Sequence, residues 1–171
     1  MSFAFVFPGQ GSQSVGMMAA YGDAAVVRAT FDEASAALGD DLWAMVADGP
    51  AELLTQTVNT QPVMLTAGIA AWRLWLEKGG KKPAVVAGHS LGEYSALVAA
   101  GVIDFKDAVP LVRLRAAAMQ EAWQNRDRFA AMGTAARAHV AAHFTWEHFR
   151  TRILAGYARA NYFVRPVRTA F

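Results

Sequence analysis

Residues 84–101 place a serine at the junction between two contrasting kinds of sequence. A short apolar run enters the pentapeptide Gly-His-Ser-Leu-Gly at 88–92, and an alanine-rich run leaves it. This order predicts a β-strand, a sharp turn and an α-helix, which is the context of a nucleophile elbow. The two glycines let the chain turn beside Ser90 without a Cβ clash. Ser90 would begin the helix, where free N–H groups and the helix dipole favour developing negative charge.

The composition favours a single packed domain. The chain has 171 residues, of which 54% are hydrophobic, and it has no cysteine. Disulfides and thiolate metal sites are therefore excluded, so a covalent nucleophile must be an oxygen or a nitrogen. The apolar N-terminus lacks basic residues and ends at Pro8, which is too short for a signal peptide. No apolar stretch reaches the length of a membrane span, so we expect a cytoplasmic protein that does not bind membranes.

The apolar patterns predict an α/β protein with a parallel sheet. Segments 3–7 and 84–87 are typical of buried parallel strands, and all other periodic segments predict helices. Thr60 is expected to cap the longest helix, with Pro62 in its first turn, and Pro110 is expected to kink a later helix. The predicted helices span 14–21, 24–38, 40–48, a short helix opened by Pro50, 60–78, 91–100, 104–123, 127–143 and 146–160, followed by an irregular segment at 161–171. Two strands are too few to bury a sheet, so strands are either missed or absent.

Two further residues are candidates for the same site. Gln10 lies between two glycines just after the first strand, and it would share a sheet edge with Ser90 if the two strands pair. The backbone N–H of Leu91 would be an oxyanion donor in an elbow. The alternatives are a turn glutamine that bonds to its own loop and a serine that only caps a helix.

Arg115 is the candidate for anion binding. It follows Arg113 by two residues, so the two side chains cannot share one helix face. Leu111, Leu114 and Met119 define the expected apolar side of this helix, and Arg115 lies at its border. A guanidinium in a cleft suits a carboxylate, because its planar fork can bind both oxygens. A surface arginine is the alternative.

A serine nucleophile needs a base, and the chain has four histidines. The ring of His89 is expected to project away from its neighbour Ser90. His139 and His143 lie one helical turn apart, which also suits a metal pair, but no carboxylate accompanies them. These two and His148 are therefore expected to be surface or helix-packing residues.

The charge changes character near residue 122. Residues 1–122 have 8 basic and 12 acidic residues, whereas residues 123–171 have 8 arginines and 2 acids. This shift indicates two segments of different origin, 1–122 and a basic helical tail at 123–171. Nucleic-acid binding would be one use of the tail, but a solvated helix face explains the spread of its arginines, so no nucleic acid is expected.

Several motifs in order over residues 1–122 resemble the malonyl-CoA:acyl carrier protein transacylase family and related acyltransferase domains. They are Phe-Val-Phe-Pro-Gly-Gln-Gly-Ser-Gln at 5–13, Asn-Thr-Gln-Pro at 59–62, Gly-His-Ser-Leu-Gly-Glu-Tyr-Ser-Ala-Leu-Val at 88–98, Ala-Gly-Val-Ile-Asp-Phe at 100–105, and Arg115 with Met119-Gln120. The resemblance implies a truncated acyltransferase with an α/β-hydrolase-like core, a short parallel sheet and mostly helices. It also implies fatty acid or polyketide biosynthesis as the setting.

The resemblance implies a role for each candidate residue. Ser90 would take malonyl from coenzyme A as an ester and pass it to the phosphopantetheine thiol of acyl carrier protein. The N–H groups of Gln10 and Leu91 would form the oxyanion hole. Arg115 would bind the malonyl carboxylate, and Gln61 and His89 would line the substrate site. No metal and no bound cofactor are implied, since the coenzyme A thioester is the substrate.

The tail departs from this family. The family's general base is a downstream histidine after a ferredoxin-like subdomain, and residues 123–171 show neither. Residues 132–137 and 143–148 instead resemble the C-terminal helices of GT-B glycosyltransferases. We therefore expect impaired transfer, with a serine esterase or lipase and a non-catalytic fragment as alternatives. Exposed apolar surface would favour self-association.

Overall fold

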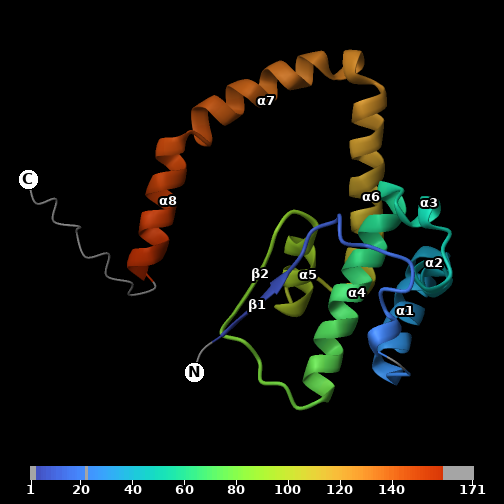
Figure 1. The fold of residues 1–171 in the computed structure, drawn as a ribbon. Coiled ribbons are helices and arrows are strands. Elements are labelled where there is room, and N and C mark those ends of the chain that lie inside the picture. The colour runs from blue at the N-terminus through green and yellow to red at the C-terminus, as the bar shows by residue number, and fades with distance from the viewer. Residues whose placement is uncertain (1–2, 22, 160–171) are drawn as a thin grey trace, which may run out of the picture. The chain divides into compact units, whose positions relative to one another are not determined.

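A computed structural model describes residues 3–21 and 23–159 of the chain. The chain divides into two compact units, residues 1–121 and residues 122–171 (Figure 1). The prediction that residues 1–122 and 123–171 differ in origin stays a prediction. None of the helices in the described ranges is long and apolar enough to cross a membrane.

The first unit contains both strands and most of the helices, with one helix that runs on into the second unit. Its elements are β1 Ala4–Phe7, the 3₁₀ helix Ala19–Tyr21, α1 Ala25–Leu38, α2 Leu42–Ala47, α3 Ala51–Leu54, α4 Thr57–Glu77, β2 Val85–Gly88, α5 Leu91–Ala99 and α6 Phe105–Gln124. The predicted helix at 14–21 is wrong over its first part, since only Ala19–Tyr21 is helical. The other predicted helices up to residue 123 are found, with ends that differ by a few residues.

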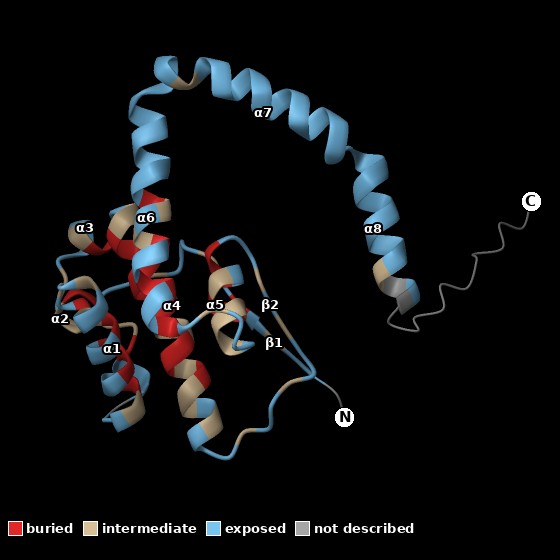
Figure 2. Cartoon of the chain, turned by 180° about the vertical axis from the view of Figure 1, so that it is seen from behind, coloured by how far each residue is buried: buried red, intermediate tan, exposed pale blue. Residues whose placement is uncertain are grey.

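The second unit consists of a 3₁₀ helix, Arg126–Phe129, and the helices α7, Ala130–His143, and α8, Trp146–Arg159. None of the residues of α7 is buried, and the described side chains of α8 are exposed or half-buried (Figure 2). The helix predicted at 127–143 therefore begins as a 3₁₀ turn. Ala160 and the segment predicted to be irregular, 161–171, lie outside the described residues.

The two strands form a parallel sheet in which Phe7 is opposite Gly88. These are the only strands in the described residues. The prediction that both strands are buried is wrong, because helices cover one face of the sheet only. Phe7 is buried, but Ala4, Val6, Val85 and Ala87, which alternate with the inward residues, are exposed.

The core of the first unit is built around α4, which the other helices surround in Figure 1. Fully buried side chains such as Phe31 of α1, Leu65 and Ile69 of α4 and Val109 of α6 belong to this core. A smaller cluster joins the sheet to α4, where the rings of Phe5 and Trp72 lie 5.2 Å apart in an edge-to-face arrangement. The sheet is therefore anchored to the helical core through aromatic side chains.

The start of α4 differs from the prediction. The helix begins at Thr57, after Gln56, so Thr60 lies within the first turn rather than at the cap and Pro62 lies further inside. The hydroxyl of Thr60 donates to the carbonyls of Leu54 and Gln56, at 2.7 and 3.0 Å. A threonine can satisfy its hydroxyl in this way inside a helix, which is why its cap preference was misleading.

The apolar side predicted for α6 is wrong. Leu114 and Met119 are 66% and 52% exposed, and Leu111 is exposed as well. The buried side instead consists of the smaller residues Ala108, Val109, Val112 and Ala116, after Phe105 at the start of the helix. These residues belong to the core of the first unit, so the buried face of α6 is set by the side on which the helix packs, which the spacing of its leucines does not determine.

Candidate active site

Ser90 lies in a strained turn between β2 and α5. Its φ of 53° and ψ of −109° make it the one non-glycine residue with positive φ in the described part of the chain. Such a conformation costs about 1–3 kcal/mol and is held only where the surrounding structure over-determines it. The side chain is exposed at the N-terminus of α5. This is the strand–turn–helix geometry that the sequence predicts for a nucleophile elbow.

The two glycines of the turn are required by backbone contacts. A Cβ on Gly88 would overlap the carbonyl of Gly92, and a Cβ on Gly92 would overlap the carbonyl of Phe7 and lie 2.7 Å from that of Pro8. The first turn of α5 thus touches both β2 and the end of β1 through main-chain atoms. Ser90 is positioned by these contacts.

The Gln10 loop leaves the sheet beside the serine. The N–H of His89 donates to the carbonyl of Phe7 at 3.4 Å, and a Cβ on Gly9 would lie 3.1 Å from the carbonyl oxygen of His89. The expected shared edge is therefore present, and Gln10 is exposed there. Leu91 is the first residue of α5, where a helix has N–H groups without intrahelical partners. The oxyanion roles of Gln10 and Leu91 stay predictions.

Arg115 connects the serine to the core. Its Nη2 donates to Ser90 Oγ at 3.1 Å, and its Nη1 donates to Gln61 Oε1 at 2.7 Å. The guanidinium carbon also lies 5.7 Å from the ring centre of Tyr94, on α5. The guanidinium thus faces the elbow, as expected for an arginine in a cleft. Its position lets one side chain contact Ser90 and bind an anion next to it.

Gln61 is fully buried on α4, and its hydrogen bond fixes the guanidinium of Arg115 from the core side. Its Nε2 points to Met119 Sδ at 3.9 Å, so both ends of the amide have a neighbour from α6. Sequence reasoning placed Met119 on the apolar side of the helix rather than beside Gln61, and it gave Tyr94 no contact with Arg115. The available signal was helical spacing, since Met119 follows Arg115 by four residues and Tyr94 follows Ser90 by four.

Arg113 points to a different part of the unit. Its Nη1 pairs with Asp40 Oδ2 at 2.7 Å, and its Nε and Nη2 are buried without a partner in the described residues. The two arginines of α6 therefore diverge, as their spacing predicts.

The histidines do not complete the site within the first unit. His89 is exposed, and its Nδ1 would lie 3.7 Å from a Cβ on Gly9, so the ring lies beside the Gln10 loop. In the second unit, the rings of His139 and His143 have their centres 4.7 Å apart, and His148 Nδ1 lies 2.8 Å from Thr145 Oγ1. Across residues 3–21 and 23–159, no three His, Cys, Asp or Glu side chains group as metal ligands.

Comparison with known proteins shows which family this chain matches. A family model described as an acyl transferase domain matches residues 4–148. The malonyl CoA-acyl carrier protein transacylase of Salmonella typhimurium is 64% identical over 121 residues, which cover 70% of this chain and 39% of that protein. The protein of the same name from Bacillus subtilis strain 168 is 50% identical over 120 residues and 38% of its length. The chain thus spans about two fifths of the length of these relatives.

Solved structures agree in the same region. An acyl-carrier-protein S-malonyltransferase from Burkholderia pseudomallei superimposes with a TM-score of 0.70 at 67% identity, over 71% of this chain and 40% of that one. A malonyl-transacylase in complex with a type II polyketide acyl carrier protein gives the same TM-score at 62% identity and the same coverage. The resemblance of the tail to GT-B glycosyltransferases stays a prediction.

Proposed function

Since this chain belongs to the acyl transferase domain family, we propose that it transfers a malonyl group from coenzyme A to the phosphopantetheine thiol of acyl carrier protein. The observation that carries this proposal is the contact of one guanidinium with both Ser90 and Gln61. A nucleophile beside a fixed cation suits a thioester that carries a free carboxylate. The names of the relatives, which are transacylases for malonyl CoA and acyl carrier protein, point the same way.

The proposed chemistry has two half-reactions. Ser90 Oγ attacks the thioester carbonyl carbon, the carbon–sulfur bond breaks, and the serine proton leaves with the coenzyme A thiol. The carrier-protein thiol then attacks the malonyl-serine ester, and its proton returns to Ser90 Oγ. Arg115 binds the malonyl carboxylate throughout, which favours malonyl over acetyl. The N–H groups of Gln10 and Leu91 bind the oxyanion in both steps. His89 lines the substrate site beside the Gln10 loop.

Proton transfer limits the rate in this proposal. His89 is the only histidine in residues 1–121, and it has no hydrogen bond to Ser90 in the described structure. A positioned general base contributes about 10²–10⁴-fold to such a reaction, so we expect a loss of that size relative to the longer relatives. No metal ion and no bound cofactor take part in the proposed reaction.

The test is mass spectrometry of the whole chain after incubation with excess malonyl-CoA. The expected result is one malonyl ester, located on Ser90 by peptide mapping, which is absent from Ser90→Ala. Arg115→Ala should lose the malonyl ester but still accept acetyl from acetyl-CoA. A chain without any malonyl ester after hours of incubation overturns the proposal. Hydrolysis of simple esters without a preference for malonyl would favour a serine esterase instead.

A further inference from the structure

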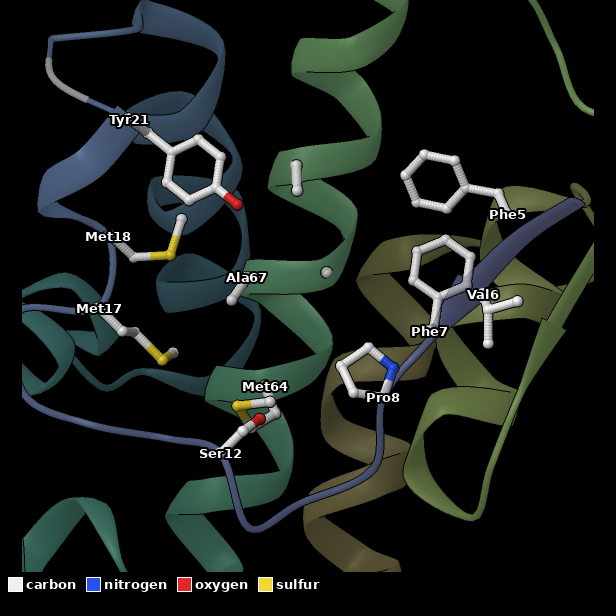
Figure 3. A pocket seen from close by; sticks show the side chains of 12 residues that line it. Phe5, Val6, Phe7, Pro8, Ser12, Met17, Met18, Tyr21, Met64 and Ala67 are labelled. Carbon is white, nitrogen blue, oxygen red and sulfur yellow. The ribbon is translucent and has the colours of Figure 1, made fainter.

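The carboxylate of the proposed substrate needs a cation, which limits where it can bind in the first unit. A cavity of about 210 Å³ lies between β1, the 3₁₀ helix Ala19–Tyr21 and α4 (Figure 3). All of its lining residues are uncharged, and most are apolar, such as Phe5 and Met64. This cavity offers no partner for a carboxylate, whereas the guanidinium of Arg115 does. Binding of the carboxylate then depends on what holds Arg115 beside Ser90.

Two hydrogen bonds position Arg115, but one of them changes during the proposed reaction. Its Nη1 donates to Gln61 Oε1 at 2.7 Å, and its Nη2 donates to Ser90 Oγ at 3.1 Å. Ser90 Oγ is the reacting atom, so its lone pairs are rearranged when the ester forms. The bond to Gln61 remains, but a single hydrogen bond lets the guanidinium turn about it. A further contact is therefore needed to keep the guanidinium beside the elbow.

The ring of Tyr94 supplies this contact. Tyr94 lies on α5, one helical turn after Ser90, and its half-buried side chain packs against the core. The centre of its ring is 5.7 Å from the guanidinium carbon of Arg115. This distance is within the range of about 6 Å over which an aromatic face attracts a cation. Because α5 begins at the elbow, Tyr94 holds Arg115 at a fixed position relative to Ser90.

An aromatic ring holds a cation without using its hydrogen-bond donors. A guanidinium has N–H groups in a planar fork, and the ring of Tyr94 attracts the charge through its π face instead. A carboxylate partner would neutralise the charge, as Asp40 does for Arg113 at 2.7 Å. The three contacts of Arg115 described above are with neutral side chains. Its positive charge therefore stays available for the carboxylate of a substrate.

We propose that Tyr94 is a positioning residue, which holds the guanidinium of Arg115 beside Ser90 and leaves its N–H groups free for the carboxylate of a dicarboxylic acyl thioester. This inference rests on the proposed function and adds the residue that orients its cation. Loss of the ring would let the guanidinium move away from Ser90. It would therefore weaken binding of a malonyl thioester and leave an acetyl thioester, which has no free carboxylate, unaffected.

The first test measures formation of the Ser90 ester by mass spectrometry at increasing concentrations of malonyl-CoA or acetyl-CoA. Tyr94→Leu and Tyr94→Met keep an apolar side chain but lose the ring. Half-maximal ester formation should then need about two- to fivefold more malonyl-CoA, with no change for acetyl-CoA. Tyr94→Phe keeps the aromatic face and should behave like the parent chain. No change in either ringless variant, or an equal change for both thioesters, overturns the proposal.

Val98→Ala is the matched control. Val98 lies on α5 one turn after Tyr94, and it is also half-buried and packs against the same core. Its truncation should lower the thermal unfolding midpoint but leave the preference for malonyl over acetyl unchanged. Circular dichroism establishes that each variant is folded. If Val98→Ala changes the preference as much as Tyr94→Leu does, packing of α5 explains the effect and the positioning role is wrong.

A second test does not depend on the proposed function. In the whole chain labelled with ¹⁵N, the Nε–H signal of Arg115 is identified by its disappearance in Arg115→Lys. Since an aromatic ring shifts the resonances of protons near its face, this signal should move in Tyr94→Leu and stay near its place in Tyr94→Phe. A signal that does not move in Tyr94→Leu overturns the proposal. If the parent chain forms no malonyl ester, the proposed function fails, and this signal alone decides whether Tyr94 positions Arg115.

Discussion

Replacement of Gly92 by alanine tests whether main-chain contact positions Ser90. The new Cβ would overlap the carbonyl of Phe7 and lie 2.7 Å from the carbonyl of Pro8. Neither neighbour is the end of a flexible side chain, so β1 or α5 must move as a unit. Overpacking of this kind costs about 1–3 kcal/mol, and contact with backbone belongs at the upper end.

The higher helix propensity of alanine opposes part of this loss of stability. Gly92 lies in the first turn of α5, where alanine is favoured over glycine by about 1 kcal/mol. The free energy of unfolding should therefore fall by about 2 kcal/mol. Gly101→Ala is the matched control, since it has nothing within 4 Å but a φ of +73°. Its strain of about 1–2 kcal/mol is partly offset by the stiffer unfolded chain, so it should cost under about 1 kcal/mol.

The assay is urea unfolding of the two variants and the parent chain, monitored by circular dichroism. The three curves are fitted with one common dependence of the unfolding free energy on urea concentration. Incubation with malonyl-CoA then shows whether the displaced elbow still forms the Ser90 ester. If Gly92→Ala proves as stable as the parent, or more stable, the β1 and α5 backbones can separate freely. The contact would then not be what positions Ser90, and the reasoning fails.

Three other outcomes follow from the described geometry. The free energy of unfolding of Ser90→Gly should exceed that of Ser90→Ala by about 1 kcal/mol, because glycine adopts the φ of 53° without strain. Equal stability of the two variants in urea unfolding would show that the turn is not strained. Gln61→Leu should raise the malonyl-CoA concentration for half-maximal ester formation about tenfold without affecting acetyl-CoA, since Arg115 loses an acceptor; parallel changes for both would argue against a carboxylate site. Leu114→Lys should change stability by less than about 0.5 kcal/mol and shift sedimentation toward monomer, since this leucine is 66% exposed.

Local features of the site could be predicted from the sequence, whereas long-range ones could not. The turn around Ser90 depends on five consecutive residues and their flanks, so its geometry is visible in the pattern. The contact between Arg115 and Ser90 joins residues 25 positions apart and depends on how α6 packs. Spacing alone therefore could not decide whether Arg115 lies in a cleft or on the surface.

The errors have a common cause in packing. The α6 prediction relied on Leu111 and Leu114, which are exposed, whereas the helix packs on the core through Ala108, Val112 and Ala116. The strands were expected to be buried because their sequences do not alternate with polar residues. One face of the sheet is exposed, so the apolar sequence of the strands indicates a surface that other residues would have to bury. The described residues do not bury it.

The backbone contact between Gly88, Gly92 and Phe7 also limits which substitutions the turn accepts. A turn held by main-chain atoms excludes any side chain at these two positions, because a Cβ at either glycine would overlap backbone atoms. The conformation of Ser90 is therefore specified by backbone packing between residues 7 and 92.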